Sequence, residues 1–269
     1  MRHMKGYDEI INRLNQIAGH WYLSSREGPT GIGKTLEDLL GICENNIPGP
    51  NGEMLELKAI RDDAKNMITL FTKSPEPKNA IRTLLNKFGY KDRRRGTNRL
   101  TLHETLSGKD YTLVSNKYKL KVDYRTDNFS NVNKIVIVDN NNTVYAYWMR
   151  ETLRKSFENK MRRVLLVKAK SRRLGNRECL CYHEGLVMKD FSFEKFLKLI
   201  MDGTVKIDLR IGLYENGRTH DHGTGFRVTL DALPECFKTI EKVLDVTCDD
   251  SRECLQVQPI DCEPPDISL

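Results

Sequence analysis

The sequence predicts a fold of the α/β class, in which helices and strands both contribute to the core. Residues 7–19 and 191–201 place apolar side chains at helical spacing, as amphipathic helices do. Residues 53–60 and 205–214 alternate instead with the period of two that is typical of strands. The chain has 269 residues, of which 39% are hydrophobic, so it can bury one large core or two moderate lobes.

The charge balance favours a polyanionic partner. Lysine and arginine outnumber aspartate and glutamate by 44 to 37, which gives a formal net charge of +7 and an isoelectric point near 9.0. Nucleic-acid-binding proteins often have this balance, although a solvated basic surface also produces it. No apolar run approaches the roughly 20 residues of a membrane span, and residues 1–5 lack the apolar core of a signal peptide. We therefore expect a soluble, cytoplasmic protein with no membrane partner.

The cysteines do not form a zinc-binding pattern. There are seven of them, and none are paired as C-x-x-C, which argues against a zinc site. Cys179 and Cys181 share a face if residues 178–182 form a strand, and we expect them to be buried free thiols. Later cysteines lie beyond Asp245 in a segment without a clear period, which we expect to be a C-terminal tail over residues 246–269, either an adjunct to the rest of the chain or a mobile segment.

The stretch over residues 28–35 fits the phosphate-binding pattern G-x-x-x-x-G-K-[ST] without a mismatch. A nucleotide-binding loop of this kind needs a buried strand that runs directly into it, whereas residues 24–27 are polar or charged. We interpret the stretch as a turn that starts a helix ending near Gly41, with Glu37 near its first turn. A P-loop NTPase stays open as an alternative function, because residues 135–139 resemble the second NTPase motif. A hairpin also explains those residues.

The rest of the chain shows further strand and helix patterns. A loop rich in proline, glycine and asparagine over residues 45–52 precedes the strand at 53–60. Residues 90–99 are charged and contain a glycine, which is typical of a solvated loop or of a contact to a DNA backbone. A turn at residues 215–218 leads to a second segment, 219–228. Other strands are predicted over residues 67–73, 119–124, 134–139, 144–148 and 163–169, with a helix over 152–161.

Four positions near the start of the chain suit a phosphodiester-cleaving site. Hydrolysis of a phosphodiester without covalent catalysis requires one or two divalent ions, which carboxylates hold. Glu56 and Lys58 lie on the same face of their strand, residue 51 comes five positions before Glu56, and Glu37 lies in the preceding helix. An E-x-K pair alone occurs often by chance. Together with the turn, the glutamate-bearing helix and the Pro/Gly loop, it predicts a nuclease.

Five sequence blocks, residues 30–40, 56–58, 69–75, 208–212 and 219–224, carry a family resemblance. In this order along the chain they resemble the MvaI/BcnI restriction endonucleases, in particular the MvaI branch, and the first blocks also resemble the mismatch-repair nicking enzyme MutH. The likeness covers roughly residues 7–230.

The resemblance implies a MutH-like fold with two lobes, a mixed sheet in the catalytic lobe and double-stranded DNA in a cleft between the lobes. It further implies a monomer that depends on Mg²⁺ and cleaves within a short sequence of the CCNGG type. We expect one two-lobed unit over residues 1–245, with the catalytic lobe centred on 7–110 and the recognition lobe centred on 160–235.

The resemblance also assigns catalytic residues, with one departure from the family pattern. Glu56 and Lys58 match the acid and the lysine of the strand, and Glu37 matches the helical glutamate. Asn51 stands where the pattern has a metal-binding aspartate, so the predicted metal ligands are Asn51 and Glu56. An amide oxygen brings no negative charge, and its presence should lower metal affinity and rate. Glu53 could supply the charge instead, although it lies on the opposite strand face.

The later blocks provide candidate DNA-binding residues. Arginine can donate twice to guanine, aspartate can accept from cytosine, and histidine can do either. For His220 and His222 a metal site is the alternative. The resemblance therefore favours a type II restriction endonuclease, and the alternatives are the P-loop NTPase and a sequence-specific DNA-binding protein that no longer cleaves. The predicted DNA-binding set is Lys73, Asp208, Arg210, Tyr214, His220, Asp221, His222 and Arg227.

Overall fold

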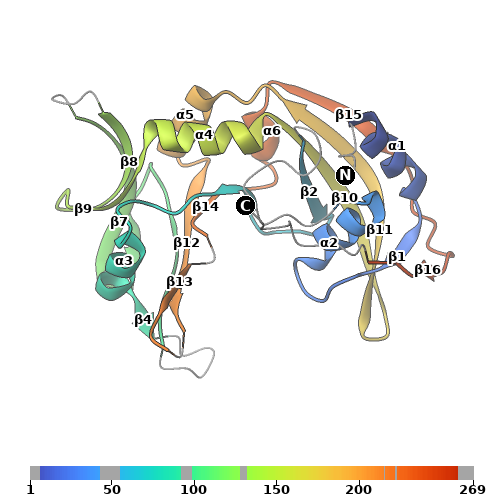
Figure 1. Cartoon of the computed structure of the whole chain (residues 1–269), viewed down its shortest axis with the longest axis horizontal. Helices are drawn as coiled ribbons and strands as arrows, with labels where there is room; N and C mark the ends of the chain where they lie inside the picture. Colours follow the sequence, from blue (N-terminus) through green and yellow to red (C-terminus); the bar gives the residue numbers. More distant parts are fainter. Residues whose placement is uncertain are drawn as a thin grey trace, which may run out of the picture. The chain divides into compact units, whose positions relative to one another are not determined.

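The computed structural model describes residues 7–42, 55–91, 99–127, 132–214, 216–221 and 223–259. Contacts divide the chain into two units (Figure 1). Unit 1 consists of Met1–Lys65, Asn159–Asp190 and Phe237–Leu269, and unit 2 consists of Asn66–Glu158 and Phe191–Cys236. The expected lobes, centred on 7–110 and 160–235, differ from these units, because the chain leaves unit 1 after Lys65 and returns to it twice.

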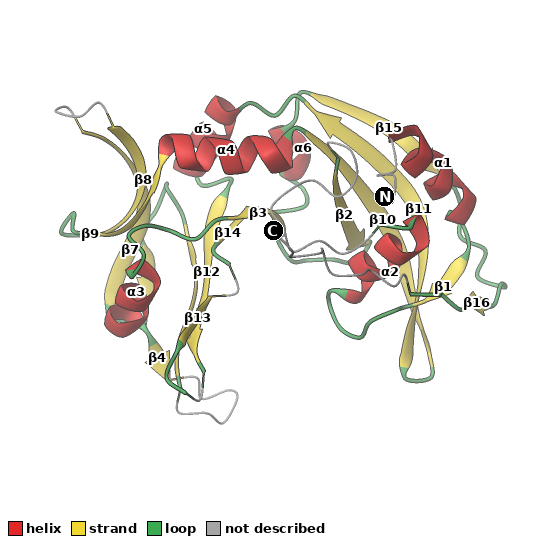
Figure 2. Ribbon diagram, viewed as in Figure 1, coloured by secondary structure: helices red, strands yellow, loops and turns green. Residues whose placement is uncertain are grey.

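Unit 1 is built on a mixed sheet with the strand order β16-β1-β11-β10-β2, and β15 also pairs with β11 (Figure 2). β2 runs parallel to β10 and β16 runs parallel to β1, whereas β1, β10 and β15 are antiparallel to β11. The elements are α1 (Tyr7–Ile17), β1 (Trp21–Leu23), α2 (Gly31–Leu40), β2 (Glu56–Arg61), β10 (Arg163–Leu174), β11 (Arg177–Lys189), β15 (Thr239–Asp245) and β16 (Cys254–Leu255).

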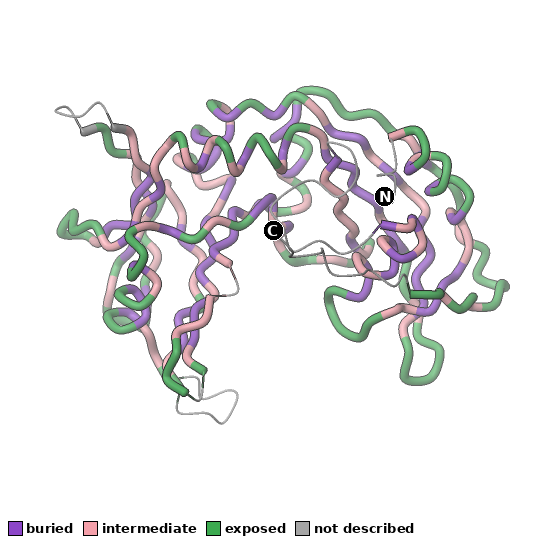
Figure 3. Tube along the Cα trace, viewed as in Figure 1, coloured by how far each residue is buried: buried purple, intermediate pink, exposed green. Residues whose placement is uncertain are grey.

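The core of unit 1 lies between this sheet and the two helices. Leu14 of α1, Leu36 of α2 and Leu165 of β10 are fully buried in one apolar cluster, and the buried course of the inner strands is visible in Figure 3. On β2, Leu57 and Ala59 pack against that cluster. Because side chains alternate along a strand, Glu56 and Lys58 project from the other face of β2, as the sequence predicts.

The described part of the segment after Asp245 packs on unit 1, which agrees with an adjunct and not with a mobile tail. β16 extends the sheet beside β1, and two disulfides, Cys179–Cys254 and Cys181–Cys248, join it and the loop before it to β11. The prediction of free thiols at Cys179 and Cys181 is therefore wrong, although both lie in one buried cluster with Trp21. The sequence pattern does not show the return of the chain to this face. Residues 260–269 lie outside the described part.

Unit 2 contains two sheets of antiparallel strands. One has the order β3-β14-β12-β5-β4, with β13 also paired to β12, and the other has the order β6-β7-β8-β9. The elements are β3 (Ile68–Thr72), α3 (Ala80–Phe88), β4 (Tyr90–Lys91), β5 (Leu100–Leu106), β6 (Thr112–Val114), β7 (Tyr118–Asp127), β8 (Val132–Asp139), β9 (Val144–Met149), α5 (Phe193–Met201), β12 (Lys206–Leu213), β13 (Thr219–Asp221), β14 (Gly225–Val228) and α6 (Leu233–Cys236). Helix α4 (Arg150–Met161) starts in unit 2 and ends in unit 1.

An aromatic cluster forms the centre of unit 2. The rings of Phe71 and Phe226 are stacked with centroids 4.8 Å apart, and Phe196 and Trp148 pack against Phe226 at 5.6 and 5.5 Å. This cluster fixes β3, β14, α5 and β9 relative to one another. No helix in the described part of the chain is long and apolar enough to cross a membrane.

The structure does not support the interpretation of residues 135–139 as an NTPase motif. These residues belong to β8, whose neighbours β7 and β9 are both antiparallel to it. Asp139 Oδ1 accepts hydrogen bonds from the backbone N–H groups of Asn141 and Thr143, both at 2.9 Å. The aspartate therefore closes a hairpin turn, which is the simpler of the two interpretations of this stretch.

Candidate active site

The predicted pair Glu56 and Lys58 forms the centre of a small charged cluster in unit 1. Lys58 Nζ lies 3.2 Å from Glu56 Oε1, and Lys160 Nζ lies 3.1 Å from Glu56 Oε2. The side chains of Glu56 and Lys58 are each only 12% exposed. A mostly buried carboxylate is thus bracketed by two ammonium groups, one from its own strand and one from the last turn of α4.

Burial alters the ionisation of Lys58. Desolvation lowers the pKa of Lys58 below its usual value, the Glu56 carboxylate partly offsets this, and the positive charge of Lys160 lowers the pKa further. A lysine in this setting donates hydrogen bonds beside a carboxylate in a poorly hydrated place. Such perturbed groups are concentrated at functional sites.

Glu37 is half-buried in α2, which packs against β2. The helix ends as predicted at Gly41, whose φ of 73° is left-handed and whose N–H donates to Asp38 O. Ile42 N–H closes the cap on Glu37 O at 2.8 Å. Glu37 is therefore near the end of the helix that the sequence predicts, and not near its first turn, because the helix already begins at Gly31.

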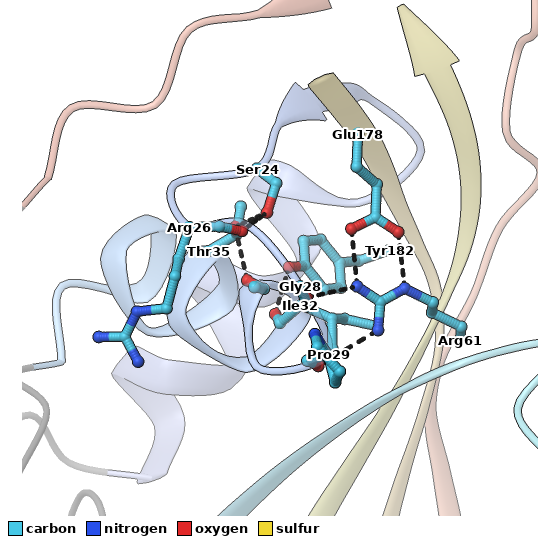
Figure 4. Close-up of polar contacts among 10 residues, drawn as sticks. Ser24, Arg26, Gly28, Pro29, Ile32, Thr35, Arg61, Glu178 and Tyr182 are labelled. Carbon is cyan, nitrogen blue, oxygen red and sulfur yellow. Dashed lines mark hydrogen bonds and ion pairs between the residues drawn. The ribbon is translucent and has the colours of Figure 1, made fainter. Parts of the chain in front are cut away.

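The glycine-rich turn before α2 is held by hydrogen bonds within the protein (Figure 4). Thr35 Oγ1 donates to Gly31 O at 2.8 Å and accepts from Ser25 N at 2.9 Å. At Gly31 a Cβ atom would lie 2.2 Å from Arg26 O, so the close approach of the turn to the helix start requires glycine there.

The lysine and the threonine that would bind phosphate in a nucleotide-binding loop have partners within the protein. Lys34 Nζ forms an ion pair with Asp38 Oδ1 at 3.0 Å, and Thr35 Oγ1 is occupied as described. The strand before the turn, β1, is antiparallel to β11. The structure therefore favours a turn that starts a helix over the loop of a P-loop NTPase.

Arg61 connects this turn to the strand of Glu56 and Lys58. Its Nη1 and Nη2 donate to Pro29 O and Gly28 O at 3.3 and 3.4 Å, and its Nε and Nη2 donate to the carboxylate of Glu178 (Figure 4). Tyr182 reaches the first turn of α2 from β11, where its hydroxyl donates to Ile32 O at 2.7 Å. These contacts fix the start of α2 relative to the sheet.

In unit 2, Asp208 contacts two other residues of the candidate DNA-binding set, Arg210 and Arg227. Its Oδ2 forms ion pairs with Arg227 Nη1 at 2.8 Å and with Arg210 Nε at 3.5 Å, and its Oδ1 accepts from Thr105 Oγ1 at 3.0 Å. Arg227 also donates to Met67 O. Asp208 is buried, so it orients the two arginines and has little surface left for a base.

Arg210 lies beside the loop that separates β13 from β14. Both strands pair with the same edge of β12. Between them along that edge, Arg210 Nη2 donates a hydrogen bond to Gly223 O at 3.4 Å. Asp221, the last residue of β13, accepts a hydrogen bond at its Oδ2 from Thr224 Oγ1 at 3.3 Å, and burial raises the pKa of Asp221. Lys73 joins the group, because its N–H donates to Thr224 O.

Tyr214 and His220 form a neighbouring ring pair. Their centroids are 4.5 Å apart, and Tyr214 is 54% exposed. A Cβ atom at Gly212, which is opposite His220 in the β12–β13 pairing, would lie 2.7 Å from the histidine ring. Glycine at this position therefore gives the His220 ring its place over β12.

Three of the residues that the sequence analysis considers, Asn51, its alternative Glu53, and His222, lie outside the described residues. Within the described ranges no group of three or more His, Cys, Asp or Glu side chains converges as a metal site would. Glu56 offers the oxygen donors that Mg²⁺ prefers. The Glu56 carboxylate therefore has the right kind of donor atom for Mg²⁺. In this structure its two oxygens form ion pairs with Lys58 and Lys160.

Sequence reasoning missed Lys160, Arg61 and Glu178. Lys160 contacts Glu56 because α4 ends beside β2. Arg61 on β2 reaches Glu178 on β11 across β10, the strand between them. Such pairings between distant segments have no local sequence pattern. The even spacing of Leu57, Ala59 and Arg61 was the available signal that Arg61 belongs to the face toward α2.

Comparisons with known proteins point to one family. Residues 11–237 match the model of the MvaI/BcnI restriction endonuclease family. The structure of restriction endonuclease MvaI with its cognate DNA substrate is similar at a TM-score of 0.76 and 31% identity, covering 90% of this chain and 100% of that one. MvaI in the absence of DNA is similar at a TM-score of 0.54 and 28% identity, covering 91% and 100%. No curated protein matches.

Proposed function

The chain belongs to the MvaI/BcnI restriction endonuclease family and is thus a site-specific DNA nuclease, and we propose that it cleaves duplex DNA within a short CCNGG-type sequence by Mg²⁺-dependent hydrolysis. The observation that carries the proposal is the cluster of Glu56 and Lys58 on one face of β2. MvaI itself has been solved with a cognate DNA substrate. We further propose that one chain acts as a monomer.

Each residue of the unit 1 cluster has a chemical task in this proposal. Glu56 would hold Mg²⁺, together with the side chain at position 51. The ion supplies activation of water and neutralises charge on the leaving oxygen. Lys58 donates hydrogen bonds to a phosphate oxygen or to the attacking water from a mostly buried position, where such donors act strongly. Glu37 is proposed as the third acidic group, from α2.

Asn51 limits the activity of the chain as given. Its amide can touch a metal ion but adds no charge, and the site has few carboxylates to compensate for that loss. We propose that metal affinity and cleavage rate are low for this reason. The second candidate function, a sequence-specific DNA-binding protein that does not cleave, is motivated by the same residue.

Recognition is assigned to the unit 2 set. Arg210 is the candidate for guanine, because its terminal nitrogens are less committed than those of Arg227. Tyr214 offers an exposed aromatic ring beside His220, Asp221 offers an acceptor, and Lys73 is proposed to contact the DNA backbone. His222 is assigned to the same set as a proposal.

The deciding experiment compares the chain as given with Asn51→Asp. Duplexes selected by binding from a random pool are incubated with each protein and Mg²⁺, and Glu56→Gln in the Asn51→Asp protein is the control. Mg²⁺-dependent cleavage at one sequence by Asn51→Asp, lost in the control, supports the nuclease. Selective binding with no cleavage by either protein, in Mn²⁺ as well, supports the non-cleaving function.

A further inference from the structure

The two oxygens of Glu56 lie beside two different cations. Oε1 is 3.2 Å from Lys58 Nζ and Oε2 is 3.1 Å from Lys160 Nζ. The Lys160 side chain is 21% exposed and the Glu56 side chain 12%. Charges this poorly hydrated interact more strongly than charges on an open surface. The attraction between Lys160 and Glu56 is therefore stronger than in an exposed pair, while the desolvation of both charges opposes it.

The two lysines differ in how they are held. Lys58 is two residues from Glu56 on the same strand face, so the backbone of β2 keeps it near the carboxylate whatever else binds. Lys160 reaches Glu56 from the last turn of α4, at the end of a flexible four-carbon stem. Lys160 can consequently leave Oε2 by rotating its side chain, while Lys58 stays nearby.

Charge balance makes Lys160 a competitor of any divalent ion at Glu56. Each oxygen of the Glu56 carboxylate already lies beside an ammonium group. A divalent ion that binds Oε2 must replace the Lys160 ammonium there and is repelled by it at short range. Each cation that stays close lowers the affinity for the ion.

We propose that Lys160 is a positioning residue that acts as the built-in counter-cation of Glu56. It holds the carboxylate oriented and neutralised while no divalent ion is bound, and it sets the affinity for the ion by competing for Oε2. The inference rests on the proposed function only in taking Glu56 as a metal ligand. Its effect is greatest with Asn51, whose amide contributes no charge against the competitor.

The test is a titration with Mn²⁺ alone, followed by electron paramagnetic resonance or calorimetry, without DNA. Lys160→Met keeps the apolar stem and removes the charge, so it should bind Mn²⁺ about tenfold more tightly than the parent. Lys160→Arg keeps a cation and should stay within about twofold of the parent. Lys155→Met is the matched control, since Lys155 is exposed on the same helix, and should leave the affinity unchanged.

A double-mutant cycle tests whether Lys160 changes metal affinity through Glu56. In a Glu56→Gln protein, Lys160→Met should raise Mn²⁺ affinity much less than it does in the parent, because the carboxylate for which the two cations compete is gone. A lysine with only a structural role would lower the melting temperature without raising metal affinity. Lys160→Gln provides a second uncharged variant in case the methionine protein does not fold.

The titration is run on the chain as given and on Asn51→Asp. Unchanged or weaker Mn²⁺ binding in Lys160→Met and Lys160→Gln overturns the proposal, as does an equal gain in the Glu56→Gln protein or no Mn²⁺ binding by any variant. Cleavage is not the readout. A protein that shows the predicted titrations and cuts no DNA contradicts the proposed nuclease function while supporting the role of Lys160.

Discussion

Arg61 and Glu178 form a bidentate ion pair in which Nε and Nη2 of the arginine each lie 2.6 Å from a carboxylate oxygen. The pair joins β2 to β11 across β10, the strand between them. The same guanidinium donates to Gly28 O and Pro29 O in the turn before α2. A single side chain thus ties the strand of Glu56 to the helix of Glu37.

Replacing Arg61 by alanine should lower the free energy of unfolding by about 2 kcal/mol, because it leaves the half-buried Glu178 carboxylate without its cation. Urea denaturation measures the change. Arg125→Ala is the control, since its ion pair with Asp123 involves an arginine that is 44% exposed, and it should cost less than about 0.5 kcal/mol. Equal losses in the two variants would show that the Arg61 pair does not stabilise the turn.

Replacing Lys58 by methionine should remove cleavage and preserve DNA binding. In the Asn51→Asp protein we expect single-turnover cleavage to fall on the order of 100-fold or more, the usual cost of one preorganised donor in a catalytic site. Binding to the selected duplex, measured by fluorescence anisotropy in Ca²⁺, should change less than about threefold, because binding is assigned to unit 2. Parallel losses in both assays would place Lys58 in binding and not in catalysis.

The two arginines around Asp208 should separate recognition from stability. Arg210→Ala should reduce discrimination between the selected duplex and single-base variants by about 1–3 kcal/mol, with little change in unfolding. Arg227→Ala should lower the free energy of unfolding by about 2 kcal/mol, because it leaves buried Asp208 with its weaker partner. Competition binding and urea denaturation on both proteins measure these effects. The reverse pattern would exchange the two roles.

Reduction of the disulfides should destabilise unit 1. Cys181–Cys248 closes a loop with a sequence separation of 67, and the loss of such a constraint costs about 4 kcal/mol in the chain-entropy model. Thermal unfolding with and without dithiothreitol gives the difference. Cys181→Ser with Cys248→Ser should reproduce much of the effect without reductant. Two serine variants that melt at the temperature of the parent would show that this bridge does not form.

Local periodicity was enough to predict most of the elements but not their assembly. The spacing in α1 and α5 predicted both helices, and alternation predicted β2 and β12. Helix α3 was overlooked, although Ala80, Leu84 and Phe88 have helical spacing. The division into units depends on pairings such as β2 with β10, which join segments far apart in the sequence and have no local pattern.

The candidate site likewise contains residues that the sequence pattern predicts and residues that only the fold brings together. Glu56 and Lys58 were predictable because two residues on one strand share a face. Lys160 was not, because only the course of α4 brings it to Glu56. For Asp208 the residue type suggested a base contact, whereas its burial and its two arginine partners make it a support for others. Residue type indicates a possible chemistry, and burial determines whether a ligand can reach it.

Cys236 should make the stability of unit 2 sensitive to high pH. Burial raises the pKa of its thiol from 9.0 to about 12, so the folded state favours the protonated form. The unfolded chain releases this proton above about pH 9, and the stabilisation present below that pH is lost as the pH rises toward 12. The slope reaches about 1.4 kcal/mol per pH unit.

Urea denaturation at pH 8, 9.5 and 10.5, on the parent and on Cys236→Ala, measures this effect. The difference between the two proteins cancels the contributions of all other titrating groups, provided that the substitution leaves their surroundings unchanged. The parent should lose more stability than the alanine protein between pH 9.5 and 10.5. Parallel pH profiles would mean that the thiol ionises equally well in the folded and unfolded chain, which contradicts the burial of Cys236 at the end of α6.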